Sequence, residues 1–403
     1  MSSTTHVNST ELPAFPGTRL ARCPLDPPPE YSDWRQAQGL TRALWRGKEV
    51  WVVSRYADIR QALSDPRISA DDRTPGFPMQ APPTSGIPQA FARMDDPEHA
   101  RLRRMLTGEF TVKQVRNQRP HVEELVDHFL EKMVREGQPA DLVDAFALPI
   151  PSMVISQLLG VPYAEHEFFQ QHSATLMSPS TAEAQEAASA ALFGYLYELV
   201  ARKEQAPADD LISRQLQRVA TGEISRETVV VNALSLLIAG HETTANMISL
   251  STLALLQNPE LATRLRDTDD AALIANIVEE LLRYLTIPQD AVFRAATEDL
   301  TLGGQPIKAG DALIMNLPSA NRDEAFTADP DLVDGDRNLS GHLAFGYGTH
   351  QCIGQNLARV ELQIALPALL RRLPNLRLAV PPEELEFRNG TITYGLHRLP
   401  VAW

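Results

Sequence analysis

The chain has 403 residues, of which 43% are hydrophobic and 22% are charged. These proportions are typical of a globular protein with a sizeable core, and they exclude collagen-like, low-complexity and disordered classes. Asp and Glu outnumber Lys and Arg by 51 to 37, which gives a formal net charge of -14. A negative charge of this size removes the electrostatic basis for binding nucleic acid or an anionic membrane.

The chain carries no sequence signal for export or for membrane insertion. The most apolar stretch, residues 229–239, contains Asn232 and Ser235 and is shorter than the roughly 18 residues of a membrane span. The first residues lack the basic start and the apolar core of a secretory signal, so we expect a cytoplasmic protein. Only Cys23 and Cys352 are present, so a disulfide framework is not expected.

The N-terminal part of the chain predicts few regular elements. Residues 1–22, rich in Ser, Thr and Pro, predict an irregular lead-in, and residues 23–403 predict one domain, because no linker separates two cores. Residues 49–53 predict a strand and residues 56–63 a short helix. A second Pro-rich stretch, residues 74–88, predicts a long loop that is either disordered or functional, for example as a lid.

Helical periodicity dominates the middle of the chain. The longest predicted helix begins near Ser225, a good N-cap residue, and ends before Asn258 and Pro259, which start the next helix. At about 1.5 Å per residue this helix is about 50 Å long. Another helix is predicted from Asp269–Asp270 to Tyr284.

Strand-like segments follow Pro288. Residues 300–302 and 306–307 predict one hairpin, and residues 385–387 and 391–393, on either side of Asn389-Gly390, predict another. The sequence therefore predicts a mainly α protein with small antiparallel β-sheets.

A glycine-rich segment at residues 345–354, Phe-Gly-Tyr-Gly-Thr-His-Gln-Cys-Ile-Gly, precedes a predicted helix over residues 355–370. Its glycines allow left-handed torsions and a close approach of the backbone to a flat ligand. A cysteine at a helix N-terminus has a lowered pKa, which suits a thiolate metal ligand. Without this context, Cys352 would be interpreted as a buried inert side chain.

This segment resembles the haem-binding loop of the cytochrome P-450 superfamily, Phe-Gly-x-Gly-x-His/Arg-x-Cys-x-Gly, with every defining position filled. The resemblance implies that Cys352 is the axial thiolate ligand of the iron of haem b, with Phe345, Gly346 and Gly354 against the cofactor. It extends over nearly all of residues 23–403. It implies a single large, triangular fold, mainly α with small sheets, in which the long central helix crosses the haem.

A second motif, Ala-Gly-His-Glu-Thr-Thr at residues 239–244, lies inside the longest predicted helix. A structural polar kink is one interpretation, and the zinc-protease motif His-Glu-x-x-His is excluded because its second histidine is absent. The segment is similar to the oxygen-activating signature of the same superfamily, in which small residues such as Ala239 and Gly240 leave room for dioxygen. The resemblance implies that Thr243 hydrogen-bonds the oxygen and that Glu242 supplies protons.

Glu280 and Arg283 are three residues apart on a predicted helix. Alone, such a pair is an ordinary surface ion pair of little energetic weight. In this chain order it resembles the superfamily's Glu-x-x-Arg, a buried pair that supports the haem loop. Arg337 is the expected third member.

Several cationic side chains are expected to hold the haem propionates. His99 and Arg103 lie one helical turn apart on one face, and two such donors suit a carboxylate. By resemblance, Arg294 and His350 match the other propionate contacts. Each of the four alone would more often be a solvated surface charge.

Residues 101–119 carry six basic residues and one acidic residue in a chain of negative net charge. A solvated helix face is one interpretation. The resemblance implies that an acidic ferredoxin, reduced by a ferredoxin reductase, delivers two electrons on the thiolate side, and we expect this patch to be its dock. It also implies a monomer.

The resemblance is to bacterial enzymes that hydroxylate macrolides, sterol-like compounds, statin precursors and xenobiotics. It implies a monooxygenase that uses O2 to hydroxylate a C–H bond of a mid-sized hydrophobic molecule in a large apolar pocket. The residues expected to contact the substrate are Leu176, Leu236, Ala239, Thr243, Val292, Phe293 and Thr393.

Two other functions remain open at this point. A haem-thiolate nitric oxide reductase would lack the acid of the oxygen-activating motif, whereas Glu242 is present here. A non-catalytic binder of haem or of a small molecule would have no use for the Glu242–Thr243 pair. The sequence also leaves open whether Asp290 contacts substrate or solvent.

Overall fold

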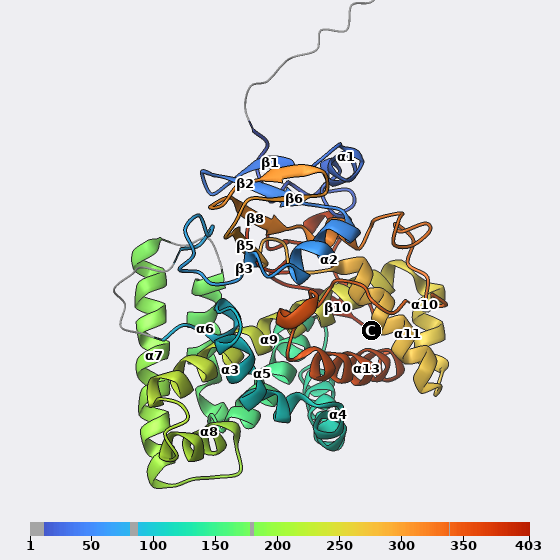
Figure 1. Cartoon of the computed structure of the whole chain (residues 1–403). Helices are drawn as coiled ribbons and strands as arrows, with labels where there is room; N and C mark the ends of the chain where they lie inside the picture. The colour runs from blue at the N-terminus through green and yellow to red at the C-terminus, as the bar shows by residue number, and fades with distance from the viewer. Residues whose placement is uncertain (1–11, 81–87, 178–180, 338) are drawn as a thin grey trace, which may run out of the picture.

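The computed structural model describes residues 12–80, 88–177, 181–337 and 339–403 (Figure 1). The fold is mainly helical with small sheets, as the sequence predicted. The strands of the main sheet lie together at the top of the view in Figure 1, and most of the helices lie below them. No helix in these ranges is long and apolar enough to cross a membrane.

The described α-helices are α1 (Glu30–Gln36), α2 (Tyr56–Ser64), α3 (Glu98–Thr107), α4 (Val112–Glu136), α5 (Pro149–Leu159), α6 (His166–Met177), α7 (Ala182–Gln205), α8 (Leu211–Ala220), α9 (Arg226–Gln257), α10 (Pro259–Asp267), α11 (Ala271–Leu285), α12 (Leu317–Ala320) and α13 (Gln355–Arg372). The described strands are β1 (Thr41–Trp45), β2 (Lys48–Val53), β3 (Ile68–Ser69), β4 (Ala140–Asp141), β5 (Phe293–Ala296), β6 (Leu300–Leu302), β7 (Gln305–Ile307), β8 (Ala312–Met315), β9 (Arg377–Leu378) and β10 (Pro400–Ala402).

Helix α9 confirms the longest predicted helix. Its first turn is capped by Ser225, whose side chain accepts a hydrogen bond from the backbone N–H of Thr228, and it ends before Asn258. Its 32 residues span about 48 Å at the usual rise per residue. Buried residues occur on all sides of α9, as expected of a helix inside a protein, and α5, α7 and α13 pack against it.

Helix α11 and its surroundings also agree with the prediction. The side chain of Asp270 caps its N-terminus by accepting from the N–H of Ala272. The helix ends at Leu285, three residues before Pro288, and Thr286 takes a left-handed conformation there. One continuous apolar cluster joins residues of α3, α4, α5, α7, α9, α11 and α13.

The main sheet differs from the prediction because it is mixed rather than purely antiparallel. Its strand order is β1-β2-β8-β5-β3, and β2 runs parallel to β8. About 260 residues separate these two strands in the chain, so no local turn pattern in the sequence predicts the pairing. The predicted hairpin of β6 and β7 is present.

The predicted hairpin around Asn389-Gly390 is wrong in its pairing. Residues 386–388 bond to residues 395–397, for example from the N–H of Arg388 to the carbonyl of Gly395. Residues 391–393 instead turn inward and bond to residues 287–289. Thr391 and Thr393 are buried there, so tertiary packing outweighs the local turn signal.

The two Pro-rich segments are described only in part. Of the predicted lead-in, residues 12–22 are described, and Phe15 is buried against Tyr31 and Trp34 while its N–H bonds to Leu44. Of the predicted loop at 74–88, residues 81–87 lie outside the described residues.

Candidate active site

The glycine-rich segment folds into a tight loop that ends at the N-terminus of α13. Gly346 and Gly348 have positive φ angles of 71° and 75°. A Cβ on Gly348 would lie 2.6 Å from the carbonyl oxygen of Leu63, so only glycine fits there. The N–H of Cys352 donates to the carbonyl of Phe345 over 2.9 Å, which closes the loop and orients the cysteine.

The Cys352 side chain is deep in the protein, yet part of its surface is exposed, because it opens on an internal cavity. Burial raises the pKa of this thiol, which is opposite to the lowering expected from the sequence. The N–H groups of Gly354 and Gln355, together with Arg103 and Arg359, act in the other direction. The thiolate form therefore needs a further positive partner, as a bound metal would provide.

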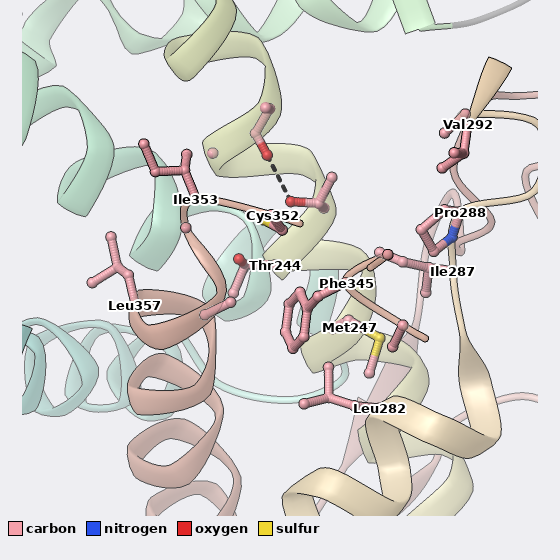
Figure 2. Close-up of a pocket in the computed structure, with 18 of the residues that line it drawn as sticks. Thr244, Met247, Leu282, Ile287, Pro288, Val292, Phe345, Cys352, Ile353 and Leu357 are labelled. Atoms are coloured by element: carbon pink, nitrogen blue, oxygen red, sulfur yellow. Dashed lines mark hydrogen bonds between the residues drawn. The ribbon is translucent and has the colours of Figure 1, made fainter. Parts of the chain in front are cut away.

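The cavity has a volume of about 300 Å³ and is lined mostly by apolar side chains. Most of its walls come from four parts of the chain: α9, residues 282–294, the loop at 344–354, and the first turns of α13. Leu63, Phe110, Ile155 and Leu317 complete the lining. The apolar lining residues visible in Figure 2 include Met247, Leu282, Ile287, Pro288, Val292, Phe345, Ile353 and Leu357.

Helix α9 presents its small residues to this cavity. Ala239 and Gly240 line the wall, and Ala239 is exposed although it lies in the interior of the protein. A Cβ on Gly240 would lie 2.7 Å from a side-chain carbon of Ile155, so glycine lets α5 pack closely here. The Thr243 hydroxyl also lines the cavity and donates to the carbonyl of Ala239 over 2.7 Å.

Glu242, unlike its neighbour Thr243, is not among the residues that line the cavity. It is buried, with 5% of its surface exposed. Its Oε2 lies 3.7 Å from Nη1 of Arg388. Burial raises the pKa of Glu242, and the charge of Arg388 opposes this effect.

Four cationic or potentially cationic side chains gather at one part of the site. The rings of His99 and His350 stack with centroids 3.9 Å apart, and His350 and Arg294 line the cavity. His99 Nε2 and His350 Nδ1 are buried without a hydrogen-bond partner in the described part of the chain. Arg103 does not line the cavity but donates to the backbone carbonyl of Gln351, next to Cys352.

The electrostatics of this cluster favour the binding of an anionic group. Burial and the charges of Arg294, His99 and Arg103, with a further contribution from Arg93, lower the pKa of His350 to about 3. Burial, with the positive charge of Arg93, also lowers the pKa of Arg294 to about 10. Buried donors of this kind are normally satisfied, and carboxylates such as haem propionates fit them.

The residues of this site therefore fit a haem group. A thiol opens on the cavity, two histidine ring nitrogens without a described partner lie close to the guanidinium of Arg294 at its edge, and Phe345, Gly346 and Gly354 line its wall. Cys352 would ligate the iron, and His99, Arg103, Arg294 and His350 would hold the propionates.

Glu280 and Arg283 form a fully buried ion pair, with two contacts of 2.8 Å. Arg283 also donates to the carbonyls of Asn321, Pro330 and Leu332. These bonds fix the segment that leads to the haem loop.

Arg337 lies on the same segment, and its Nε is 3.3 Å from Oε1 of Glu280. The structure thus brings together the three residues predicted to support the loop.

A second supporting network was not predicted. Glu279 binds both His342 and Arg359, and the Arg359 guanidinium lies 4.5 Å from the centre of the Phe345 ring. Burial alone would raise the pKa of Glu279, but His342 and Arg359 together lower it to about 2. This network ties α11, α13 and the haem loop to one another.

The predicted substrate contacts divide into two groups. Leu236, Ala239, Thr243 and Val292 line the cavity, whereas Leu176, Phe293 and Thr393 do not. Phe293 points to the other face of the sheet because side chains alternate along a strand, and its ring lies 4.9 Å from that of Trp45.

The other two residues lie elsewhere in the interior. Leu176 is half-buried on α6 against the main apolar cluster. Thr393 is 4% exposed and accepts a hydrogen bond from Asn246.

Some residues that line the cavity were not predicted from the sequence. They lie at helical spacing from residues that were predicted, so this spacing could have identified them. Met247 lies one turn after Thr243, and Leu357, Ala358 and Glu361 lie on the face of α13 that follows Gly354.

Asp290 contacts neither the cavity nor the outer solvent. It is 2% exposed, and its Oδ2 accepts a hydrogen bond from Nε1 of Trp45 over 2.8 Å. Burial raises the pKa of Asp290 to about 6, against the opposing effects of Trp45 and Arg46. Its role is to tie the cavity-lining segment at 287–292 to β1.

Comparison with known proteins agrees with a haem site, and the similarity extends over nearly the full length of this chain. A family model described as Cytochrome P450 matches residues 166–387. The chain is 50% identical to Cytochrome P450-SU2 and 46% identical to Vitamin D3 dihydroxylase, both from Streptomyces griseolus, with 96% and 98% of each chain covered.

A solved structure agrees closely as well. The mycinamicin VIII C21 methyl hydroxylase of Micromonospora griseorubida, bound to mycinamicin VIII, has a TM-score of 0.90 and 41% identity, covering 97% of this chain and 100% of that one. With the thiol, the cationic cluster and the long helix α9 arranged around one apolar cavity, this chain belongs to the cytochrome P450 family of monooxygenases.

Proposed function

We propose that this enzyme hydroxylates a C–H bond of a mid-sized hydrophobic molecule, such as a polyketide, macrolide, statin precursor or sterol-like compound. It would use haem b, O2 and two electrons from a ferredoxin. The observation that carries the proposal is the apolar cavity, which contains the Cys352 thiol and the Thr243 hydroxyl in its walls. The names of the relatives, which include a vitamin D3 dihydroxylase and a mycinamicin VIII C21 methyl hydroxylase, support the substrate class.

When bound, the haem would supply the activation of dioxygen. The chain's own residues would bind and orient the substrate and would deliver protons. The apolar wall formed by Leu236, Met247 and Val292 would hold the substrate and exclude water. In this structure the hydroxyl of Thr243 donates to the carbonyl of Ala239. During the reaction it would rotate away from this carbonyl and direct its Oγ1 proton towards the reacting oxygen.

The experiment that tests this function is an optical difference spectrum of the reduced protein with and without carbon monoxide. A strongly red-shifted Soret band indicates thiolate-ligated haem, and hydrophobic polyketides are then titrated while the spin state is followed. Ligands that shift the spin state are tested for hydroxylation with a ferredoxin and its reductase. A haem protein that lacks the shifted band contradicts the proposal, and the absence of any haem favours a small-molecule binder.

Replacing Thr243 with alanine is expected to keep the haem and to divert electrons to peroxide. We expect product formed per electron pair to fall about tenfold or more, because the hydroxyl that directs the proton is lost. Product and peroxide are measured together during turnover.

Ser235→Ala is the matched control for this change. Ser235 lies on the same helix, makes the same type of bond to the carbonyl four residues earlier, and does not line the cavity. Full coupling in Thr243→Ala would contradict the assignment of Thr243.

The ferredoxin dock that we propose is a surface hollow beside α13, the helix that begins after Cys352. Arg116, Arg119, Arg359 and Arg371 line this hollow, together with Asp269, which pairs with Arg371. Val112, 60% exposed, lies on the same surface. An apolar centre within a basic rim fits an acidic partner protein.

The patch at residues 101–119 is less uniform than its sequence suggests. Arg101 pairs with Glu98, Arg119 pairs with Glu123, and Arg103 turns inward to the haem loop. Arg104, Lys113 and Arg116 have no ion-pair partner within the described residues, so they are free to bind an acidic surface.

Arg116→Glu is expected to slow reduction by ferredoxin about tenfold at low salt, with the difference shrinking at high salt. Lys132→Glu is the matched control, since Lys132 is exposed on the same helix about 24 Å further along. Reduction rates are measured by stopped flow at several salt concentrations. Equal rates in the two variants would contradict this docking surface.

A further inference from the structure

Arg359 belongs both to the proposed docking surface and to the support of the haem loop. It lies on α13, one turn after Gln355, and it lines the surface hollow beside this helix together with Arg116. Its guanidinium also lies 4.5 Å from the centre of the Phe345 ring, and Phe345 lines the cavity that contains Cys352. The positive charge is therefore only one side chain away from the proposed haem site.

Three hydrogen bonds fix the position of this guanidinium. Its Nε and Nη2 donate to the two carboxylate oxygens of Glu279 on α11, and its Nη1 donates to Oε1 of Gln355 over 2.9 Å. A bidentate pair of this kind allows little freedom of orientation. The Arg359 side chain is only 24% exposed, so water and salt screen its charge less than that of a fully exposed arginine.

Gln355 connects the Arg359 guanidinium to the cysteine. Its side chain accepts a hydrogen bond from Arg359, while its backbone N–H helps to lower the pKa of the Cys352 thiol. The positive charge of Arg359 acts on the same sulfur in the same direction, through space. Arg103 has this effect too, but it belongs to the expected propionate contacts. The proposed chemistry gives Arg359 no role at the haem.

A fixed positive charge near a metal site favours the state of the metal that carries one more electron. Reduction of the haem iron adds one negative charge to the site, and in the protein interior this charge interacts with its neighbours more strongly than in water. Arg359 is held against the haem loop and is half-buried, so its charge stabilises the reduced state. The charge of Arg116, which is exposed on the same hollow, is screened by solvent.

We propose that Arg359 sets the reduction potential of the haem, so that a residue which helps to bind the ferredoxin also makes the haem easier to reduce. This inference rests on the proposed function. The electron comes from the ferredoxin, and no bond of Arg359 forms or breaks. Arg359 acts through its charge and through the position that Glu279 and Gln355 give to it.

The test measures the reduction potential of the haem-loaded protein by titration with dithionite and small redox dyes, without ferredoxin. Arg359→Gln is expected to lower the potential, so that the equilibrium constant for reduction falls about fivefold. Arg359→Lys keeps the positive charge and should stay close to the wild type. Arg116→Gln is the matched control, because it removes an exposed charge from the same hollow, and its potential should equal that of the wild type.

A second measurement separates this effect from docking. The rate of reduction by ferredoxin should fall in both Arg359→Gln and Arg116→Gln, because both residues line the hollow, whereas the potential should fall only in Arg359→Gln. An unchanged potential in Arg359→Gln, or an equal fall in Arg116→Gln, would overturn the proposal. An equal fall in Arg359→Lys would also overturn it, since the effect would then depend on the shape of the side chain rather than on its charge.

The carbon monoxide spectrum separates a failure of this inference from a failure of the proposed function. A wild-type haem protein without the red-shifted band contradicts the proposed function. A shifted band together with an unchanged potential in Arg359→Gln contradicts only the role of Arg359. If Arg359→Gln loses haem, Arg359→Met replaces it, because the methionine side chain can still pack against Phe345. The same fall in potential is then expected, and an unchanged potential contradicts the proposal.

Discussion

Replacing Cys352 with alanine is expected to abolish both hydroxylation and the red-shifted carbon monoxide band. The thiol of Cys352 lines the cavity, and the N–H groups of Gly354 and Gln355 favour its thiolate form. Alanine removes the sulfur but leaves the loop closed, since the loop is held by the backbone bond from residue 352 to Phe345. The spectrum of the reduced protein and the rate of product formation measure the effect.

Cys23→Ala is the control for this prediction. Cys23 is an exposed free thiol, and it does not line the cavity. The control should keep the shifted band and the wild-type rate. A shifted band in Cys352→Ala would show that another side chain ligates the haem.

Replacing Arg283 with methionine is expected to destabilise the protein by about 3–5 kcal/mol, the usual cost of breaking a buried ion pair. Arg283 has no exposed surface and donates to Glu280 and to three backbone carbonyls. Methionine fills much of the space but leaves the Glu280 carboxylate buried without its main partner. Chemical unfolding of the haem-loaded protein measures the loss, and we expect a lower haem content on purification.

Arg266→Met is the control for this change. Arg266 binds Asp267, its neighbour on α10, at the surface of the protein. Solvent and salt screen such a pair, so the control should unfold at the wild-type midpoint. Equal midpoints for the two variants would contradict a supporting role of the buried pair.

Local signals predicted the elements that carry the site. Ser225 and Asp270 act as N-caps through their own side chains, so the starts of α9 and α11 could be read from the sequence. The glycines of the haem loop take torsions that few other residues adopt, which is why the loop is recognisable without a structure.

Directions of side chains were harder to predict than elements. Val292 and Phe293 are neighbours, yet only Val292 lines the cavity, because the strand places Phe293 against Trp45. The pairing of residues 391–393 with 287–289 replaced a hairpin that the turn sequence favoured. Both outcomes depend on packing partners that are distant in the chain.

The sequence by itself determined the mainly helical class, the long central helix, the haem loop and the two motifs that identify the family. Each of these depends on residues close together in the chain. Only the tertiary structure decided which side chains meet in the cavity. It buried Asp290 against Trp45 and placed the unpartnered Glu361 in the cavity wall. Burial and charge neighbours arise from contacts between distant segments, and no local pattern encodes them.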